Sequence, residues 1–133
     1  MDFPELVQNL CKRPGMYVNP ATLETVMAYV NGFDTARDRG PLAGFREWLI
    51  VRNKWGNNLH WSSLVVRLLP DLTEQSRDEG KDDQNRIAAF GMILNEFLTL
   101  RAEQGLTAIF HDYRKWLMRQ RWYTESLRKK RDK

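Results

Sequence analysis

The sequence predicts an all-α protein, a single-domain bundle of five to six helices around one core. Three observations support this prediction. Apolar residues recur at three- and four-residue intervals in several segments, which is the period of an amphipathic helix. Pro and Gly residues lie between these segments, where they end one helix or open the next. The length of 133 residues, with 42% hydrophobic and 29% charged, suits one ordinary globular domain.

Two helices are expected before Gly40. Asp2 can cap the first, and Pro14-Gly15 ends it. Residues 16–18 are expected to form a short extended connector. Asn19-Pro20 predicts the start of the second helix, with Asn as the cap and Pro at the first helical position. The inward positions of the two helices are Phe3, Leu6, Val7 and Leu10, then Leu23, Val26, Met27, Val30 and Phe33.

A third helix is expected to open at Gly40-Pro41, and a fourth to end at Pro70. Residues 48–51 could also form a strand, but the spacing of the apolar residues around them favours a helix. The inward positions are Leu42, Phe45 and Leu49 in the third helix, and Trp61, Leu64, Val65 and Leu68 in the fourth. The bend around residues 56–58 separates them, and the acidic stretch 71–83 is expected to be an exposed loop.

The last two helices are expected at about 84–104 and 106–124, with Gly105 between them. Together with the helix at about 20–38 they would form the framework of the bundle. The apolar spacing fades after Trp122. We therefore expect one domain over residues 1–126 and a basic, disordered tail over 127–133.

The net charge of +4 comes from the C-terminal region. Residues 114–133 hold nine Lys or Arg and two acids, whereas residues 1–113 hold twelve and fifteen. The first residues do not have the pattern of a signal peptide, and no run approaches the roughly 18 apolar residues that span a bilayer. We therefore expect a cytoplasmic protein that does not bind a membrane. Cys11 is the only cysteine, and His60 and His111 lack a second ligand at a useful spacing, so no metal or cofactor is expected.

Residues 12–18, Lys-Arg-Pro-Gly-Met-Tyr-Val, resemble the opening of the gyrase B-subunit type of ATPase. That family continues into a helix whose Asn holds magnesium, and Asn31 falls near that place. The family also places a Glu one turn earlier to activate the attacking water. Here that position is Met27, which cannot take a proton. The glycine-containing segments for adenine and phosphates are missing too, so we expect no ATP hydrolysis and no catalytic residue.

A second resemblance covers roughly residues 12–100. Small bacterial helical proteins begin with Arg-Pro-x-Met-Tyr and continue through a Gly-Phe-x-x-Trp-Leu helix to a late Glu-Phe-Leu. The matching segments here are residues 13–17, 44–49 and 96–98. Some proteins of that group are immunity proteins, each of which neutralises a toxin encoded beside it. The resemblance therefore implies a non-enzymatic protein-binding protein, an immunity-type inhibitor that covers its cognate bacterial toxin sterically.

Two surfaces are expected to meet such a toxin. The acidic loop would act through complementary charge. The bend between the third and fourth helices combines Trp with polar residues, which is the composition of a binding hot spot. The predicted contact residues are Asp78, Glu79, Asp82, Asp83, Trp55, Asn57, Asn58, His60 and Trp61. The other interpretation of the bend is that its Trp residues close the end of the bundle while its Asn residues cap and turn the chain.

The C-terminal region supports an alternative function, association with nucleic acid. Its cations are Arg114, Lys115, Arg119, Arg121, Arg128, Lys129, Lys130 and Arg131, and they are interleaved with Tyr113, Trp116, Trp122 and Tyr123. Lys and Arg neutralise phosphates, and aromatic rings stack on bases. Packing of these rings in the core is the other interpretation, because Tyr113, Trp116 and Leu117 share one helix face. A homodimer, in which an identical copy covers an apolar surface, also remains open.

Overall fold

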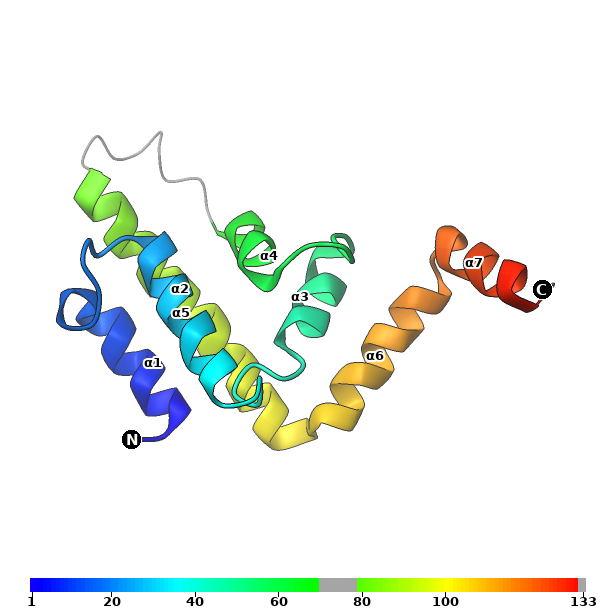
Figure 1. Cartoon of the computed structure of the whole chain (residues 1–133), viewed down its shortest axis with the longest axis horizontal. Helices are drawn as coiled ribbons and strands as arrows, with labels where there is room; N and C mark the ends of the chain where they lie inside the picture. The colour runs from blue at the N-terminus through cyan, green and yellow to red at the C-terminus, as the bar shows by residue number, and fades with distance from the viewer. Residues whose placement is uncertain (70–78, 132–133) are drawn as a thin grey trace.

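The computed structural model describes residues 1–69 and 79–131, and within these ranges it is all-helical with no strand (Figure 1). It has seven α-helices in the described residues, more than the five to six expected. The elements in order are α1 (Phe3–Lys12), the 3-10 turn η1 (Pro14–Met16), α2 (Leu23–Ala36), α3 (Phe45–Asn53), α4 (Trp61–Leu68), α5 (Glu79–Gln104), α6 (Leu106–Met118) and α7 (Arg121–Arg131). None of these helices combines the length and the apolar character that crossing a bilayer requires.

The first two helices lie along α5, the longest helix of the chain (Figure 1). Gly91 allows α1 to come close to α5, because a Cβ at this position would lie 3.1 Å from both Cβ and Sγ of Cys11. At the other end of α1, Phe3 stacks on Phe33 of α2 with ring centroids 5.6 Å apart. These contacts join α1 to α2, which follows it in the chain, and to α5, which is distant in sequence.

The predicted cap of the first helix is confirmed, whereas that of the second is wrong. Asp2 accepts a hydrogen bond from the backbone N–H of Glu5 at 2.9 Å. The second helix begins at Leu23, not at Asn19-Pro20. Thr22 is its cap, because its hydroxyl accepts from the N–H of Thr25 while the Thr25 hydroxyl accepts from the N–H of Thr22. This reciprocal pair satisfies two backbone donors, which the Asn cap would not do. The segment expected to be extended includes part of η1.

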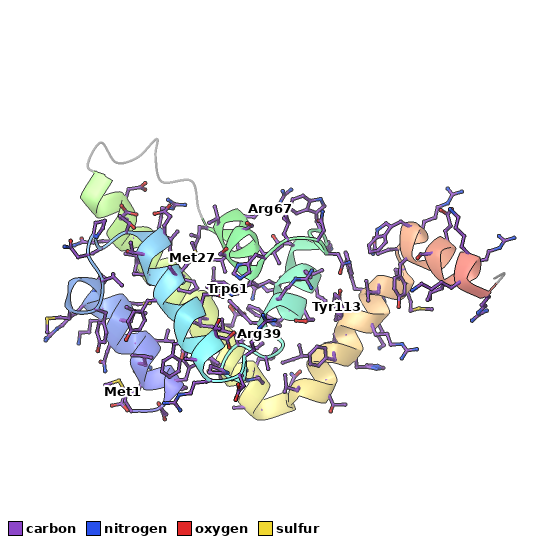
Figure 2. All side chains as sticks on the ribbon, in the orientation of Figure 1. Met1, Met27, Arg39, Trp61, Arg67 and Tyr113 are labelled. Atoms are coloured by element: carbon purple, nitrogen blue, oxygen red, sulfur yellow. The ribbon has the colours of Figure 1, made fainter. Side chains whose placement is uncertain are left out.

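Aromatic side chains from three helices form the centre of the core. Phe45 of α3 lies 5.0 Å from Phe97 and 5.6 Å from Trp61, measured between ring centroids. Trp61 in turn stacks on Phe90 of α5 at 5.9 Å. All four rings are buried, and Figure 2 shows Trp61 directed into the interior of the bundle. The helical interpretation of residues 48–51 is confirmed, since they lie within α3.

The third helix begins later than predicted, at Phe45 instead of Gly40-Pro41. The reason is Gly44, whose φ of +85° is left-handed and interrupts the helical path. A Cβ at Gly44 would also lie 2.9 Å from the side chain of Leu106, so this turn packs against the start of α6.

The preceding turn is tied to the bundle by a buried carboxylate. Asp34 is 7% exposed and accepts a hydrogen bond from the N–H of Leu42 at 2.8 Å. Arg101 of α5 donates to the carbonyl of Ala43 at 2.9 Å. These hydrogen bonds satisfy backbone groups that the turn leaves without helical partners.

The C-terminal helices differ most from the prediction. After Gly105, α6 turns sharply away from α5, and α3 lies between the arms of the resulting V (Figure 1). The single helix expected over 106–124 ends at Met118, because the N–H groups of Arg119 and Gln120 form 3-10-type bonds to carbonyls three residues back. A separate helix, α7, follows and reaches Arg131, so residues expected to form a disordered tail are helical up to that point.

The prediction of an exposed acidic loop over 71–83 is wrong for residues 79–83. Residues 79–83 form the first turns of α5, where the carboxylates of Asp82 and Asp83 are favoured by the positive end of the helix dipole. Asp83 accepts a hydrogen bond from the N–H of Leu23 at 3.2 Å, which ties the start of α5 to the start of α2. Asp78 and the other residues of the stretch 71–78 lie outside the described residues.

Candidate functional site

The bend between α3 and α4 keeps only part of its predicted contact set on the surface. Trp55 and Asn58 are exposed, and Asn57 is half-buried. His60 caps α4, since its Nδ1 accepts from the N–H of Ser62 at 3.2 Å. Trp61 is 6% exposed and belongs to the core, so it offers a partner almost no surface. Its burial agrees with the other interpretation of the bend, in which the Trp residues close the end of the bundle.

The predicted acidic residues do not join the bend. Asp82 and Asp83 lie in the first turns of α5, which Figure 1 places well away from the bend. Asp83 is half-buried by its contact with α2. The two surfaces predicted to act together therefore do not form one site within the described residues.

The bend instead meets the C-terminal helices in a groove. A cavity of about 340 Å³ lies between residues 54–58 and the α6–α7 junction. A second cavity of about 530 Å³ continues it along α6 and shares Lys54, Trp116 and Gln120 with the first. We call this continuous surface the Trp groove. Its lining residues are Val51, Lys54, Trp55, Gly56, Asn57, Asn58, Asp112, Lys115, Trp116, Arg119, Gln120 and Trp122.

Side chains from α3, which precedes the bend, and from the distant α6 hold the bend in place. Arg46 of α3 donates to the carbonyls of Leu59, at 2.9 Å, and of Asn57. The hydroxyl of Tyr113 on α6 donates to the Asn57 side-chain oxygen. Gly56 has a φ of +94°, and a Cβ there would lie 2.5 Å from Leu64 of α4. The bend is thus fixed on a rigid support, as recognition loops commonly are.

Three tryptophans supply the aromatic surface of the groove. Trp55 is 47% exposed and Trp122 is 50% exposed, and Trp116 is half-buried between them. The guanidinium of Arg67 lies 3.9 Å from the centre of the Trp55 ring. Tyr113 stacks on Trp116 at 6.3 Å, and Trp116 meets Trp122 at 6.4 Å with their planes inclined by 64°.

The charged residues that line the groove are mostly cations. Lys54, Lys115 and Arg119 lie along it, with Asp112 as the one acid in its lining. Of the residues predicted to bind nucleic acid, Lys115 and Arg119 therefore belong to this site. Arg121 pairs with Glu125 on α7 at 3.2 Å, and Arg114 is exposed on α6. The remaining four are Arg128, Lys129, Lys130 and Arg131, all exposed in the last turns of α7.

The residues that the sequence analysis considered for chemistry, Asn31, Met27 and Cys11, take part in packing and hydrogen bonding within the fold. Asn31 accepts a hydrogen bond from the Trp61 indole at 3.4 Å, and Met27 is buried. Burial raises the pKa of Cys11 to about 11, so its thiol stays protonated near neutrality. Among residues 1–69 and 82–131, His, Cys, Asp and Glu side chains nowhere gather in threes as a metal site would require.

Sequence reasoning missed the groove because its parts are far apart in the chain. Arg46, Arg67 and the Tyr113 hydroxyl shape it, yet none belongs to a local motif. The one available signal was compositional, since Trp residues and cations occur in both the bend and the C-terminal region. In comparisons with known proteins, no family model, no curated protein and no solved structure matches the chain.

Proposed function

We propose that the chain is a non-enzymatic protein-binding protein and that the Trp groove is its contact surface. The observation that carries this proposal is the pair of half-exposed rings, Trp55 and Trp122, on opposite sides of one concave surface. Tryptophans in a pocket beside polar groups are typical anchors of protein interfaces, and truncating one commonly costs about 2 kcal/mol or more of binding free energy. Because the bend is already held in place, little conformational entropy is lost on binding.

The specific form that we propose is an immunity-type inhibitor of a cognate bacterial toxin, as the resemblance over residues 12–100 implies. It would act sterically, by covering the active site of the toxin with a rigid helical surface. This mechanism requires a complementary shape, a few anchoring side chains and complementary charge. It needs no catalytic residue.

The test is to co-express the chain with the toxin-like protein encoded by the neighbouring gene and to measure growth. The natural chain should restore growth, and the Trp55→Ala/Trp122→Ala double variant should not. Met92→Ala is a matched control, because Met92 is 74% exposed on α5 and lies outside the groove. Failure of the natural chain to protect, or full protection by the double variant, would contradict the proposal.

Nucleic-acid association is the second candidate function, favoured by the four cations in the last turns of α7. Contacts to phosphate make binding steeply salt-dependent, and each lost contact reduces that dependence. A chain that ends at residue 126 should lose binding to an oligonucleotide if this function holds. The same truncation keeps the Trp groove and should leave toxin neutralisation nearly intact, which separates the two functions.

A further inference from the structure

The Trp groove presents both positive charge and apolar surface to its occupant. We infer that it takes an acidic protein segment carrying at least one large apolar side chain. This inference rests on the proposed protein-binding function and adds the chemistry of the partner surface. It also reverses the charge expected from the sequence, where acidic residues were to meet a basic partner.

The charge of the groove favours an acidic occupant. Lys54, Lys115 and Arg119 line the groove, against the single carboxylate of Asp112. The ion pairs found among the described residues are Arg52–Glu96 and Arg121–Glu125, so none of the three groove cations is paired with a described acid. An incoming carboxylate would therefore meet these cations without displacing such a pair.

The apolar requirement follows from the other half of the groove. The cavity of about 340 Å³ is bounded by Trp55, Trp116 and Trp122, with the amides of Asn57 and Asn58 at its edge. Apolar side chains gain free energy when they leave water for such a surface. A segment with acids alone would leave the rings exposed, and an apolar segment without acids would leave the cations unpaired.

The ring geometry favours a protein segment over single-stranded nucleic acid. Successive bases stack on open aromatic faces that run along the strand. Here the planes of Trp116 and Trp122 are inclined by 64°, and those of Trp122 and Tyr123 by 82°. Arg67 lies over one face of Trp55, and Tyr113 packs beside Trp116 with the ring centroids 6.3 Å apart. The rings form the walls of a pocket and not a ladder of parallel platforms.

A test is to select binders of the intact protein from a library of short random peptides. The enriched sequences should combine Asp or Glu with Phe, Trp or Leu. Affinities of the best peptide are then measured by tryptophan fluorescence and calorimetry. The variant Lys54→Glu/Lys115→Glu/Arg119→Glu should weaken binding by about tenfold or more, and Trp122→Ala should do the same.

A matched control is Arg128→Glu/Lys129→Glu/Lys130→Glu, which changes the net charge equally but lies outside the groove lining. It should change the affinity by only about twofold, because these exposed cations do not line the groove and salt screens their attraction to its occupant. Circular dichroism and thermal melting of each variant show whether it is folded. Comparable losses for the two charge-reversal variants would mean that general attraction, and not the groove, binds the peptide.

Three other results would overturn the inference: no consensus, a consensus without acids, or tighter binding of an oligo(dT) strand than of the best peptide. Its failure is distinguishable from failure of the proposed function. If the groove variant with three reversed charges still neutralises the toxin, the inference is wrong and the function stands. If acidic peptides bind the groove but no toxin is neutralised, the immunity function is wrong and the groove chemistry stands.

Discussion

The described part of residues 1–104 and the C-terminal pair α6–α7 differ in how many large side chains they bury. In the first region, rings such as Phe45, Phe90 and Phe97 are buried completely. In the second, Ile109 is the one buried apolar residue among those described, while Phe110 and Trp122 are 44% and 50% exposed. The first region therefore supplies almost all of the buried core, whereas α6 and α7 keep most of their large apolar side chains in contact with water, as Trp55 of the bend also does.

The largest expected effect on stability is in the first region. Phe97→Ala should lower the free energy of unfolding by about 3–5 kcal/mol, because it removes a buried ring that contacts Phe45 and Trp48. Urea denaturation followed by circular dichroism measures this loss. Phe110→Ala on α6 is the matched control and should cost clearly less, since Phe110 is already half in water. Equal losses would abolish the distinction between the two regions.

A smaller loss is expected where the bend meets α4. Gly56→Ala should lower the free energy of unfolding by about 1–3 kcal/mol, since it places a Cβ at a φ of +94° and 2.5 Å from Leu64. Gly32→Ala on α2 should instead raise stability, by up to about 1 kcal/mol, because a Cβ there meets nothing within 4 Å. Thermal melting of the two variants would show opposite shifts, and a stabilising Gly56→Ala would contradict the geometry of the bend.

The contact of α1 with α5 predicts a dependence on pH. Burial raises the pKa of Cys11 to about 11, so the folded chain keeps this proton at a pH where the unfolded chain loses it. The stability that comes from keeping the Cys11 thiol protonated is therefore fully present below about pH 9. It is lost as the pH rises toward 11. In the natural chain, the free energy of unfolding should therefore fall over this pH range, and Cys11→Ser should remove the part of the fall that is due to the thiol. Urea denaturation of both proteins across the range measures the difference, in which the effects of other titrating groups cancel. Parallel declines for both proteins would refute the assignment.

The smallest stability effect is expected in the groove. Trp122→Ala should change the free energy of unfolding by about 0.5 kcal/mol or less, because the ring is half exposed and lies on a helix without a buried residue. The same variant should lose toxin protection. A large loss of stability would show that α7 belongs to the core after all, and that the contrast between the two regions is wrong.

Local signals predicted much of the first region correctly. The period of 42–45–49 placed residues 48–51 in a helix, Asp2 capped α1, and Gly105 separated α5 from α6. The predicted starts of α2 and α3 were wrong because a nearby residue ended or capped the helix more effectively than the residue that the sequence analysis chose. Thr22 and Thr25 capped α2 in place of Asn19, and Gly44 delayed the start of α3.

The sequence did not determine which of the predicted contact residues lie on the surface, for a physical reason. Whether a Trp anchors a partner or fills a core depends on what packs against it, and that cannot be read from its neighbours in sequence. Trp55 and Trp61 lie six residues apart in one predicted patch. Phe45 and Phe90 bury Trp61, whereas Trp55 stays half exposed under Arg67.

The amino-acid sequence by itself determined the helical class, the inward faces of most helices and the basic character of the C-terminal region, because period, caps and charge act within a few residues. Only the tertiary structure decided that the bend and α6 share one groove. The hydrogen bonds of Asn57 to Arg46 and Tyr113 span 11 and 56 residues, and such contacts form only once the packing of the helices has brought their partners together.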